Sequence, residues 1–515
     1  MHNCAERLGG YDQFFGGLRP GKAEPETMMK DSVMRAKGMF RLCIATVLLG
    51  CASFSVASYS PASAMIQRQT TVDMAALTAA ANSGSAPAQF DLSVITGQSP
   101  VTLTESITWL KSAARQGYAP AQYNLGGAYH NGIGVTKDYV QAAQWFTKAA
   151  EQGLAQAQYN LGLCYNLGIG VKPDKAMAAM WFRKAAEQGM AEAQVNLGYA
   201  YDKGQGVKQD AVQAVNWYRK AAEAGQAQGQ YSLGLSYKLG QGVAQDLSQT
   251  IFWYTKAAAQ HLPIAMNDLG SFYRMGIAVP RDINKALTLY REAADAGNTL
   301  AQNNLGQVYG AGEGVDRDPP QAVAWFRKAA ELGNADAQFN LGVAYSNGFG
   351  VPKDDSLAMA WNQKAADQGH MMAQYKLGVF YSLPGAQQNF FVAASWLRKA
   401  ADQRVPQAQY FLGLMYQEGA GVTKNLPESI KWIRKAAEQG DANALYGLGR
   451  CYELGLGVAQ SLPWAYAYYR LAEQAGDTSV PAPRAQIVAQ ALTSQQLNRA
   501  DKTVSAWKVG DGLPD

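Results

Sequence analysis

One stretch of the sequence, Lys203-Gly204-Gln205-Gly206-Val207, has the residue types of a phosphate-binding loop. Glycines beside a lysine can let backbone N–H groups cradle an anion. Phosphate loops follow a strand and open a helix, whereas this stretch follows a segment with helical periodicity. It also recurs along the chain, with asparagine, leucine or alanine in place of the lysine. We therefore interpret it as a joint between two helices.

Few other residues have the types and spacing that chemistry needs. Beyond residue 64, His130, His261 and His370 lie at unlike positions, which predicts neither a metal site nor a nucleophile–histidine relay. Ser505 and Lys508 match the Ser-x-x-Lys pattern of penicillin-binding enzymes, but the companion Ser-Asp-Asn and Lys-Thr-Gly motifs are missing. The sequence therefore predicts a protein that is not an enzyme and that needs no cofactor or metal.

The cysteines beyond residue 64 are Cys164 and Cys451, in Gly-Leu-Cys-Tyr and Gly-Arg-Cys-Tyr. A regular array would hold them far apart, so we expect no disulfide between them. Their shared surroundings predict two small buried hydrophobic side chains rather than reactive thiols.

Length and charge narrow the class of protein. The chain has 515 residues, too many for one hydrophobic core, which indicates several domains or a repeat array. Its 45 Lys and Arg against 40 Asp and Glu give a net charge of +5, which is small for this length. No basic stripe for nucleic acid follows from that balance.

The N-terminal region has the features of an export signal. Residues 1–33 fit no pattern, and Met34 is a plausible true start. Residues 34–64 contain a basic segment, an apolar run from Leu42 to Val56 and a small-x-small cleavage site ending at Ala64. The mature chain would then be periplasmic or secreted. A second interpretation remains, because Leu-Leu-Gly-Cys51 resembles a lipobox and would make the protein an outer-membrane lipoprotein lipidated at Cys51.

A period of 36 residues, with one interval of 35, organises most of the chain. Tryptophans recur at positions 109, 145, 181, 217, 253, 325, 361, 396 and 432, and Leu-Gly pairs begin at Leu125, Leu161, Leu197, Leu233, Leu269, Leu305, Leu341, Leu377, Leu412 and Leu448. Self-similarity at this period predicts a solenoid of stacked repeats.

Each repeat is predicted to hold two helices. In the first helix, over 119–131, Leu125 lies on an apolar face and Gly126 at its edge lets a neighbouring helix approach. Asp138, with Gln141 as its capping-box partner, starts a second helix that places Trp145 on its apolar stripe. Neither helix can bury its stripe alone, so the repeats must stack.

The repeated pattern is Ala-x-Ala-Gln-x-x-Leu-Gly-x-x-Tyr, then Gly-x-Gly-Val, then Ala-x-x-Trp and Lys-Ala-Ala-Glu-x-Gly. It resembles the Sel1-like repeats, a branch of the tetratricopeptide-like superhelices. The resemblance covers about residues 86–476 and implies an all-α, right-handed solenoid of about ten two-helix repeats. We expect an N-terminal cap with a degenerate repeat over 65–100, the solenoid over 101–476 and a helical cap and tail over 477–515.

Three repeats depart from the pattern. Residues 382–389 replace the Gly-x-Gly-Val joint and are one residue short, Ala278 replaces a joint glycine, and His261-Leu262-Pro263 replaces the usual Gly-x-Ala. These repeats are expected to stack at an altered angle, through either neutral drift or a local partner site.

Two rows of side chains are candidates for binding. Lysines recur near the ends of the second helices, and we expect them to form weak ion pairs on a solvated face. The second row consists of aromatic residues two positions before the repeated leucine: Tyr123, Tyr159, Tyr231, Phe339, Tyr375, Tyr410 and Tyr446. In the resembled superhelices, first helices line the concave surface, where such a row could bind a peptide. Packing against the next repeat is the alternative.

The resemblance implies a non-catalytic scaffold or adaptor for protein–protein interaction in the bacterial envelope. The partner would be a protein or peptide, with no nucleic acid. A module that binds peptidoglycan or exopolysaccharide, or a secreted host-interaction factor, is the alternative, since the same tyrosines could stack on sugar rings.

Overall fold

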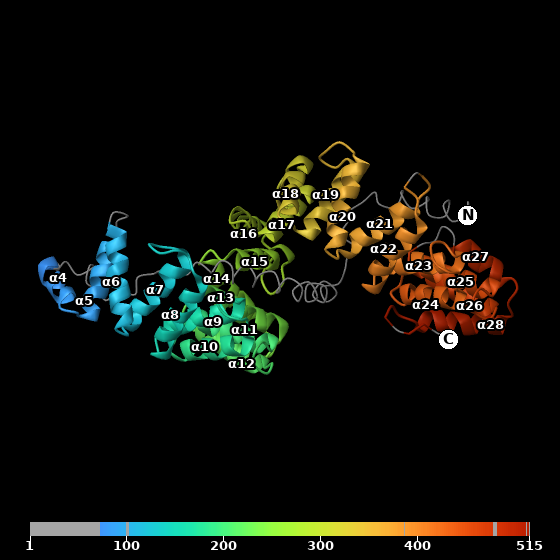
Figure 1. The fold of residues 1–515 in the computed structure, drawn as a ribbon. Helices are drawn as coiled ribbons and strands as arrows, with labels where there is room; N and C mark the ends of the chain where they lie inside the picture. Colours follow the sequence, from blue (N-terminus) through green and yellow to red (C-terminus); the bar gives the residue numbers. More distant parts are fainter. Residues whose placement is uncertain (1–72, 99–101, 386, 477–480, 511, 514–515) are drawn as a thin grey trace. The chain divides into compact units, whose positions relative to one another are not determined.

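The computed structural model describes residues 73–98, 102–385, 387–476, 481–510 and 512–513, and Figure 1 shows them as a chain of helices. The proposed export signal and Cys51 lie outside these residues. Contacts divide the chain into two compact units at residues 296 and 297. No strand occurs in the parts that the structure describes.

The unit before residue 297 holds α4 (Met74–Asn82), α5 (Ala86–Thr96), α6 (Leu103–Arg115), α7 (Ala119–Asn131), α8 (Tyr139–Glu151), α9 (Ala155–Leu167), α10 (Lys175–Glu187), α11 (Ala191–Lys203), α12 (Ala211–Glu223), α13 (Ala227–Leu239), α14 (Leu247–Ala258), α15 (Pro263–Met275) and α16 (Ile283–Asp295). The unit from residue 297 holds α17 (Thr299–Ala311), α18 (Pro319–Glu331), α19 (Ala335–Asn347), α20 (Asp355–Asp367), α21 (Met371–Ser382), α22 (Phe390–Asp402), α23 (Pro406–Glu418), α24 (Leu426–Ala437), α25 (Ala442–Leu454), α26 (Leu462–Gln474), α27 (Pro481–Ala489) and α28 (Ser494–Ala506).

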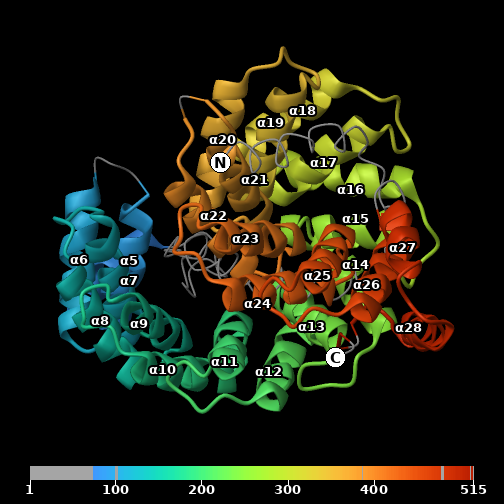
Figure 2. The ribbon, with the colours of Figure 1, turned by 90° about the vertical axis from the view of Figure 1, so that its right-hand side faces the viewer.

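Within each unit, consecutive helices pack in pairs and each pair packs on the next. Figure 2 shows this order, for example from α8 to α9 and from α23 to α24. The expected all-α solenoid of two-helix repeats is therefore present. Its predicted right-handed sense stays a prediction.

Short polar signals begin the second helices, as expected. The Asp138 carboxylate accepts the N–H groups of Val140 and Gln141, at 2.9 and 3.0 Å. The same device recurs at Asp210, Asp246 and Asn425. The reciprocal side-chain bond of a full capping box is formed between Thr493 and Gln496 at the start of α28, whereas no such box is formed between Asp138 and Gln141. The other caps act through the carboxylate or amide oxygen alone.

The glycine of each Leu-Gly pair is the point where the two helices of a repeat touch. A Cβ on Gly198 of α11 would lie 2.7 Å from the ring of Tyr218 on α12, and a Cβ on Gly126 would meet Phe146 at the same distance. The ring that fills this contact comes one residue after the repeated tryptophan. Trp145 packs against the core as a half-buried residue, as expected of the apolar stripe, while Phe146 is fully buried.

The Gly-x-Gly joints show why both glycines are needed. Gly204 ends α11 with φ +64°, in the left-handed region that suits glycine. Gly206 has φ +74°, and a Cβ there would lie 1.9 Å from the backbone oxygen of Lys175 in the preceding repeat. The joint therefore packs directly on its neighbour, which confirms its structural role. In the joint after α15, Ala278 replaces the second glycine and still has a left-handed φ of +58°.

Glutamines form a second connection between repeats. The Gln158 amide donates to the Ala150 carbonyl at 3.2 Å, and its oxygen accepts from Gln188 at 2.8 Å. Equivalent bonds join Gln152 to Gln122 and Gln439 to Gln409. Ala224 takes the place of the second glutamine one repeat later, and the buried Gln194 oxygen has no hydrogen-bond partner among the described residues.

The last two helices close the array. Arg484 of α27 pairs with Glu453 of α25, with Nε 3.0 Å from a carboxylate oxygen, and Tyr466 of α26 donates to Asp501 of α28 at 3.0 Å. Ala500 and Val504 of α28 are buried in the terminal core.

Candidate functional site

Of the two predictions for the aromatic row, packing against the next repeat describes Tyr159 and Tyr231, whose hydroxyls contact Asn196 and Asp268. Tyr123, Tyr159, Tyr231 and Tyr375 are buried, with at most 8% of each side chain exposed, while Phe339, Tyr410 and Tyr446 are half-buried. These four buried tyrosines therefore do not form an open row of aromatic rings. Whether this row contacts a partner stays a prediction.

Packing from both sides explains this burial. The Tyr159 ring lies 5.9 Å from the Phe182 ring in its own repeat, and the Tyr159 hydroxyl accepts from the Asn196 amide of the next repeat at 3.3 Å. Tyr231 packs on Tyr254 and donates to Asp268 at 3.1 Å. A first helix thus has neighbours on opposite sides, so a position far from the leucine face is also covered.

The lysine row contacts tryptophan rings. The Nζ of Lys220 lies 4.0 Å above the ring centre of Trp217, three residues earlier. The same arrangement recurs with Lys148, Lys184, Lys256, Lys328, Lys364, Lys399 and Lys435. Cation–π attraction therefore orders these exposed lysines over half-buried or buried rings, a role that the expected pairing with carboxylates did not include.

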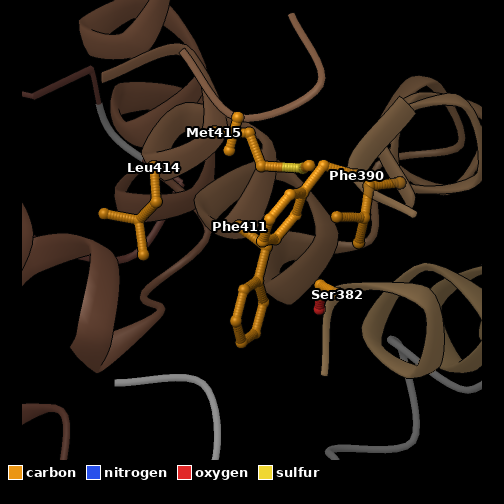
Figure 3. Close-up of a pocket in the computed structure, with 7 residues that line it drawn as sticks. Ser382, Phe390, Phe411, Leu414 and Met415 are labelled. Atoms are coloured by element: carbon orange, nitrogen blue, oxygen red, sulfur yellow. The ribbon is translucent and has the colours of Figure 1, made fainter. Parts of the chain in front are cut away.

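Two small niches between consecutive repeats differ in the side chains that line them. Figure 3 shows one of them in the unit from residue 297, beside the shortened joint between α21 and α22. It has a volume of about 10 Å³ and lies between α21, α22 and α23. Its lining is apolar: Ser382, Phe390, Leu397, Phe411, Leu414, Met415 and Ala420.

A second niche, in the other unit, is built from the same repeat positions with polar side chains. It has about 20 Å³ and is lined by Asn166, Lys175, Ala178, Ala179, Phe182, Asn196, Tyr199, Ala200 and Gln205. Phe390 stands where Lys175 does, Phe411 where Asn196 does, and Leu414 where Tyr199 does, counting the one-residue deletion. The middle residue of Gly-x-Gly, Gln205 or Ala420, lines both niches.

One substitution explains much of the change in lining. Asn196 reaches the Tyr159 hydroxyl of the preceding repeat. Phe411 occupies the same position, so the Tyr375 ring packs on the Phe411 ring at 6.0 Å. The adjoining surface is also apolar, since Phe391 is 75% exposed. The departure at 382–389 therefore coincides with a different local surface.

Comparison with known proteins identifies the repeats. The Sel1 repeat family matches eleven consecutive segments: 86–118, 119–154, 155–190, 191–226, 227–262, 263–298, 299–334, 335–370, 372–405, 406–441 and 442–477. The chain belongs to the Sel1 repeat family. Sel1 repeats are generally scaffolds for protein–protein interaction rather than catalysts. The first segment, 86–118, spans α5 and α6 and starts earlier than the array predicted from the sequence.

Solved Sel1 repeat proteins resemble this chain. The crystal structure of c5321, a protective antigen present in uropathogenic Escherichia coli strains, is 39% identical, with a TM-score of 0.67 over 84% of this chain and 93% of that one. A Sel1 repeat protein from Oxalobacter formigenes is 36% identical over 61% of this chain and 91% of that one, with a TM-score of 0.47. No curated protein matches the sequence.

The isolated candidates for chemistry have structural surroundings in this Sel1 repeat array. Burial, and secondly the charge of Lys137, lower the pKa of His130 to about 4, so its imidazole is neutral at pH 7. The His370 Nδ1 accepts from the Ala373 N–H at 3.1 Å and caps α21. Burial raises the pKa of the Cys164 thiol to about 12 and that of Cys451 to about 11.

The described residues of these Sel1 repeats were compared with the requirements of a metal site and of a membrane-spanning helix. No group of three or more His, Cys, Asp or Glu that could hold a metal is found in them. Within the same residues, every helix is too short or too polar to cross a bilayer.

The niches were missed by sequence reasoning because their residues come from three helices and a joint. A signal was nevertheless present. The slot of Asn196 holds polar residues in most repeats, Phe411 in one and Gly447 in another, while the Leu-Gly pair that follows it stays fixed. Variation of that kind within a repeat indicates a position that packing does not determine.

Proposed function

We propose that this Sel1 repeat protein is a non-catalytic scaffold of the bacterial envelope that binds protein or peptide partners along its first helices. The observation that carries the proposal is the pair of niches. The same backbone positions form both of them, yet one has a polar lining and the other an apolar lining. A fixed frame with changing local chemistry suits recognition of extended partners.

The envelope assignment rests on the export features of residues 34–64 and on the lipobox that ends at Cys51. The likeness to c5321 supports it, because a protective antigen is a molecule that the immune system can reach. Cys51 would anchor the protein if the lipobox is used, and otherwise the protein would be periplasmic or secreted.

Burial of four tyrosines argues against sugar stacking on this row, since a ring needs an open face to stack on a saccharide. Tyr159, for example, has its ring covered by Phe182 and its hydroxyl bonded to Asn196. The tryptophan rings are likewise covered by lysines. A glycan-binding role is therefore the less supported alternative.

Site-directed photocrosslinking in the native envelope tests this function. A photoreactive phenylalanine analogue would replace Leu414 or Tyr199 in the niches, and, as the control, Gln144 on the exposed face of α8. We expect defined protein adducts from the niche positions and not from Gln144. Retention of the purified protein on peptidoglycan after protein partners are stripped would contradict the proposal.

A further inference from the structure

The polar niche is lined by the exposed side chain of Lys175, at the start of α10. The Lys175 Nζ donates to the Asn166 carbonyl at 2.8 Å and to the Asn166 side-chain oxygen at 2.6 Å. A protonated lysine has three N–H donors, and these contacts account for two of them. A further acceptor can therefore bind without breaking either contact.

No carboxylate lies among the residues that line this niche. The nearby Asp174 carboxylate accepts the N–H groups of Ala176 and Met177 at the start of α10, and Asp202 pairs with Lys203 at 2.8 Å. Partial burial lowers the pKa of Lys175. The niche thus has a positive group without a negative one.

The other polar groups of the lining add donors. Asn196 and Gln205 each carry an amide NH₂, and Tyr199 carries a hydroxyl. The Asn196 amide donates to Tyr159 at 3.3 Å and has a second N–H. These groups line the same niche as the Lys175 ammonium, and a cation together with amide donors suits an anion with two acceptor oxygens.

The size of the niche limits what can enter. About 20 Å³ has room for one or two atoms of the size of a water oxygen, which excludes a nucleotide, a sugar ring or a cofactor. A terminal group at the end of a flexible chain fits this limit. The apolar niche has about 10 Å³ and no charge in its lining, so it offers nothing to an anion.

We propose that the niche around Lys175 binds a carboxylate presented by a polypeptide partner, from an Asp or Glu side chain or from a chain end. This inference rests on the proposed function, since it assumes that partners lie along the first helices. Lys175 would pair with the carboxylate, and Gln205, the middle residue of the joint, would contribute to selectivity. The partner of this unit would therefore be acidic where it meets α10 and α11.

Fluorescence anisotropy with short labelled peptides tests the inference on the full chain. The probes are three pentapeptides of glycine and serine. The first is capped and has a central glutamate, and the second has glutamine in its place. The third has no charged side chain and a free C-terminal carboxylate. A charge-assisted contact should make the glutamate or chain-end peptide bind about tenfold more tightly than the glutamine peptide. The stronger of the two shows which source of carboxylate the niche prefers.

Two variants locate the effect. Lys175→Met keeps the apolar stem of the side chain and should abolish the preference for the carboxylate. Lys172→Met removes an exposed lysine outside the niche lining and should leave the preference intact. Circular dichroism would check that both variants keep the helical content of the parent chain.

Equal binding of the glutamate, glutamine and chain-end peptides would overturn the inference, as would equal losses in the two lysine variants. Failure of every peptide to bind at millimolar concentration would overturn it as well. Photocrosslinking to proteins at Leu414 would still stand in each of those cases, so the scaffold function and the carboxylate niche can fail separately.

Discussion

Replacing Gly198 with alanine should destabilise the protein, although alanine is the better helix former. The added Cβ would lie 2.7 Å from Cδ1 and Cε1 of Tyr218 and 3.1 Å from the Ala214 carbonyl. Overpacking in a dense core costs about 1–3 kcal/mol, whereas the gain in helix propensity is about 0.5–1 kcal/mol. The net loss expected is about 1–2 kcal/mol, and Gly198→Leu should cost more.

A second glycine in a first helix provides the matched control. A Cβ on Gly310 of α17 would approach Phe349 at 3.4 Å and Ala322 at 3.6 Å, which are ordinary contacts. Gly310→Ala should therefore stabilise α17 by about 0.5–1 kcal/mol through propensity alone. The same chemical change is thus expected to act in opposite directions at two positions.

Urea unfolding followed by circular dichroism would measure both effects, and hydrogen exchange would locate them in α11 and α12 or in α17 and α18. In the background of Tyr218→Ala, which removes the ring, Gly198→Ala should become neutral or stabilising. A Gly198→Ala variant as stable as the parent protein would refute the role assigned to this glycine, and so would an unchanged cost without the ring.

Two other predictions concern contacts between repeats, and a third concerns Cys51. Tyr159→Ala should cost about 3 kcal/mol, since it removes a buried ring, whereas an exposed binding residue would lose binding and keep the melting temperature. Ala224→Gln should add about 1 kcal/mol in urea unfolding, because the new amide can donate to the Gln194 oxygen; no gain would show that this oxygen is already satisfied. Growth with labelled palmitate should label the parent chain and not Cys51→Ser if the lipobox is used, and an unlabelled parent chain would leave the soluble form.

Much of the fold could be predicted because residues close together in the sequence mark where each helix of the repeat begins and ends. Asp138 marks a helix start and Gly132 a helix end within a few residues of sequence, and the 36-residue period requires stacking. The helical cap predicted over 477–515 is present as α27 and α28, and a capping box at Thr493 begins the second of them.

The candidate site could not be predicted from the same signals. The sequence left Tyr159 either on an open face or packed against the next repeat, because one helix considered alone does not show Phe182 in its own repeat or Asn196 in the next one. Likewise, Gln188 reaches a residue 30 positions earlier, which no local pattern shows. Burial at these positions depends on how neighbouring repeats pack.

The bonds between repeats also bear on how such an array can change over generations. Removing residues 155–190, one whole repeat, would bring Gln194 to the Ala150 carbonyl that Gln158 now contacts, and Asn196 to the Tyr123 hydroxyl that Asn160 now contacts. Both of these donors would find an equivalent acceptor. Unequal recombination in the gene can therefore shorten or lengthen the protein in whole repeats, and can remove or copy a niche, without a new interface having to evolve.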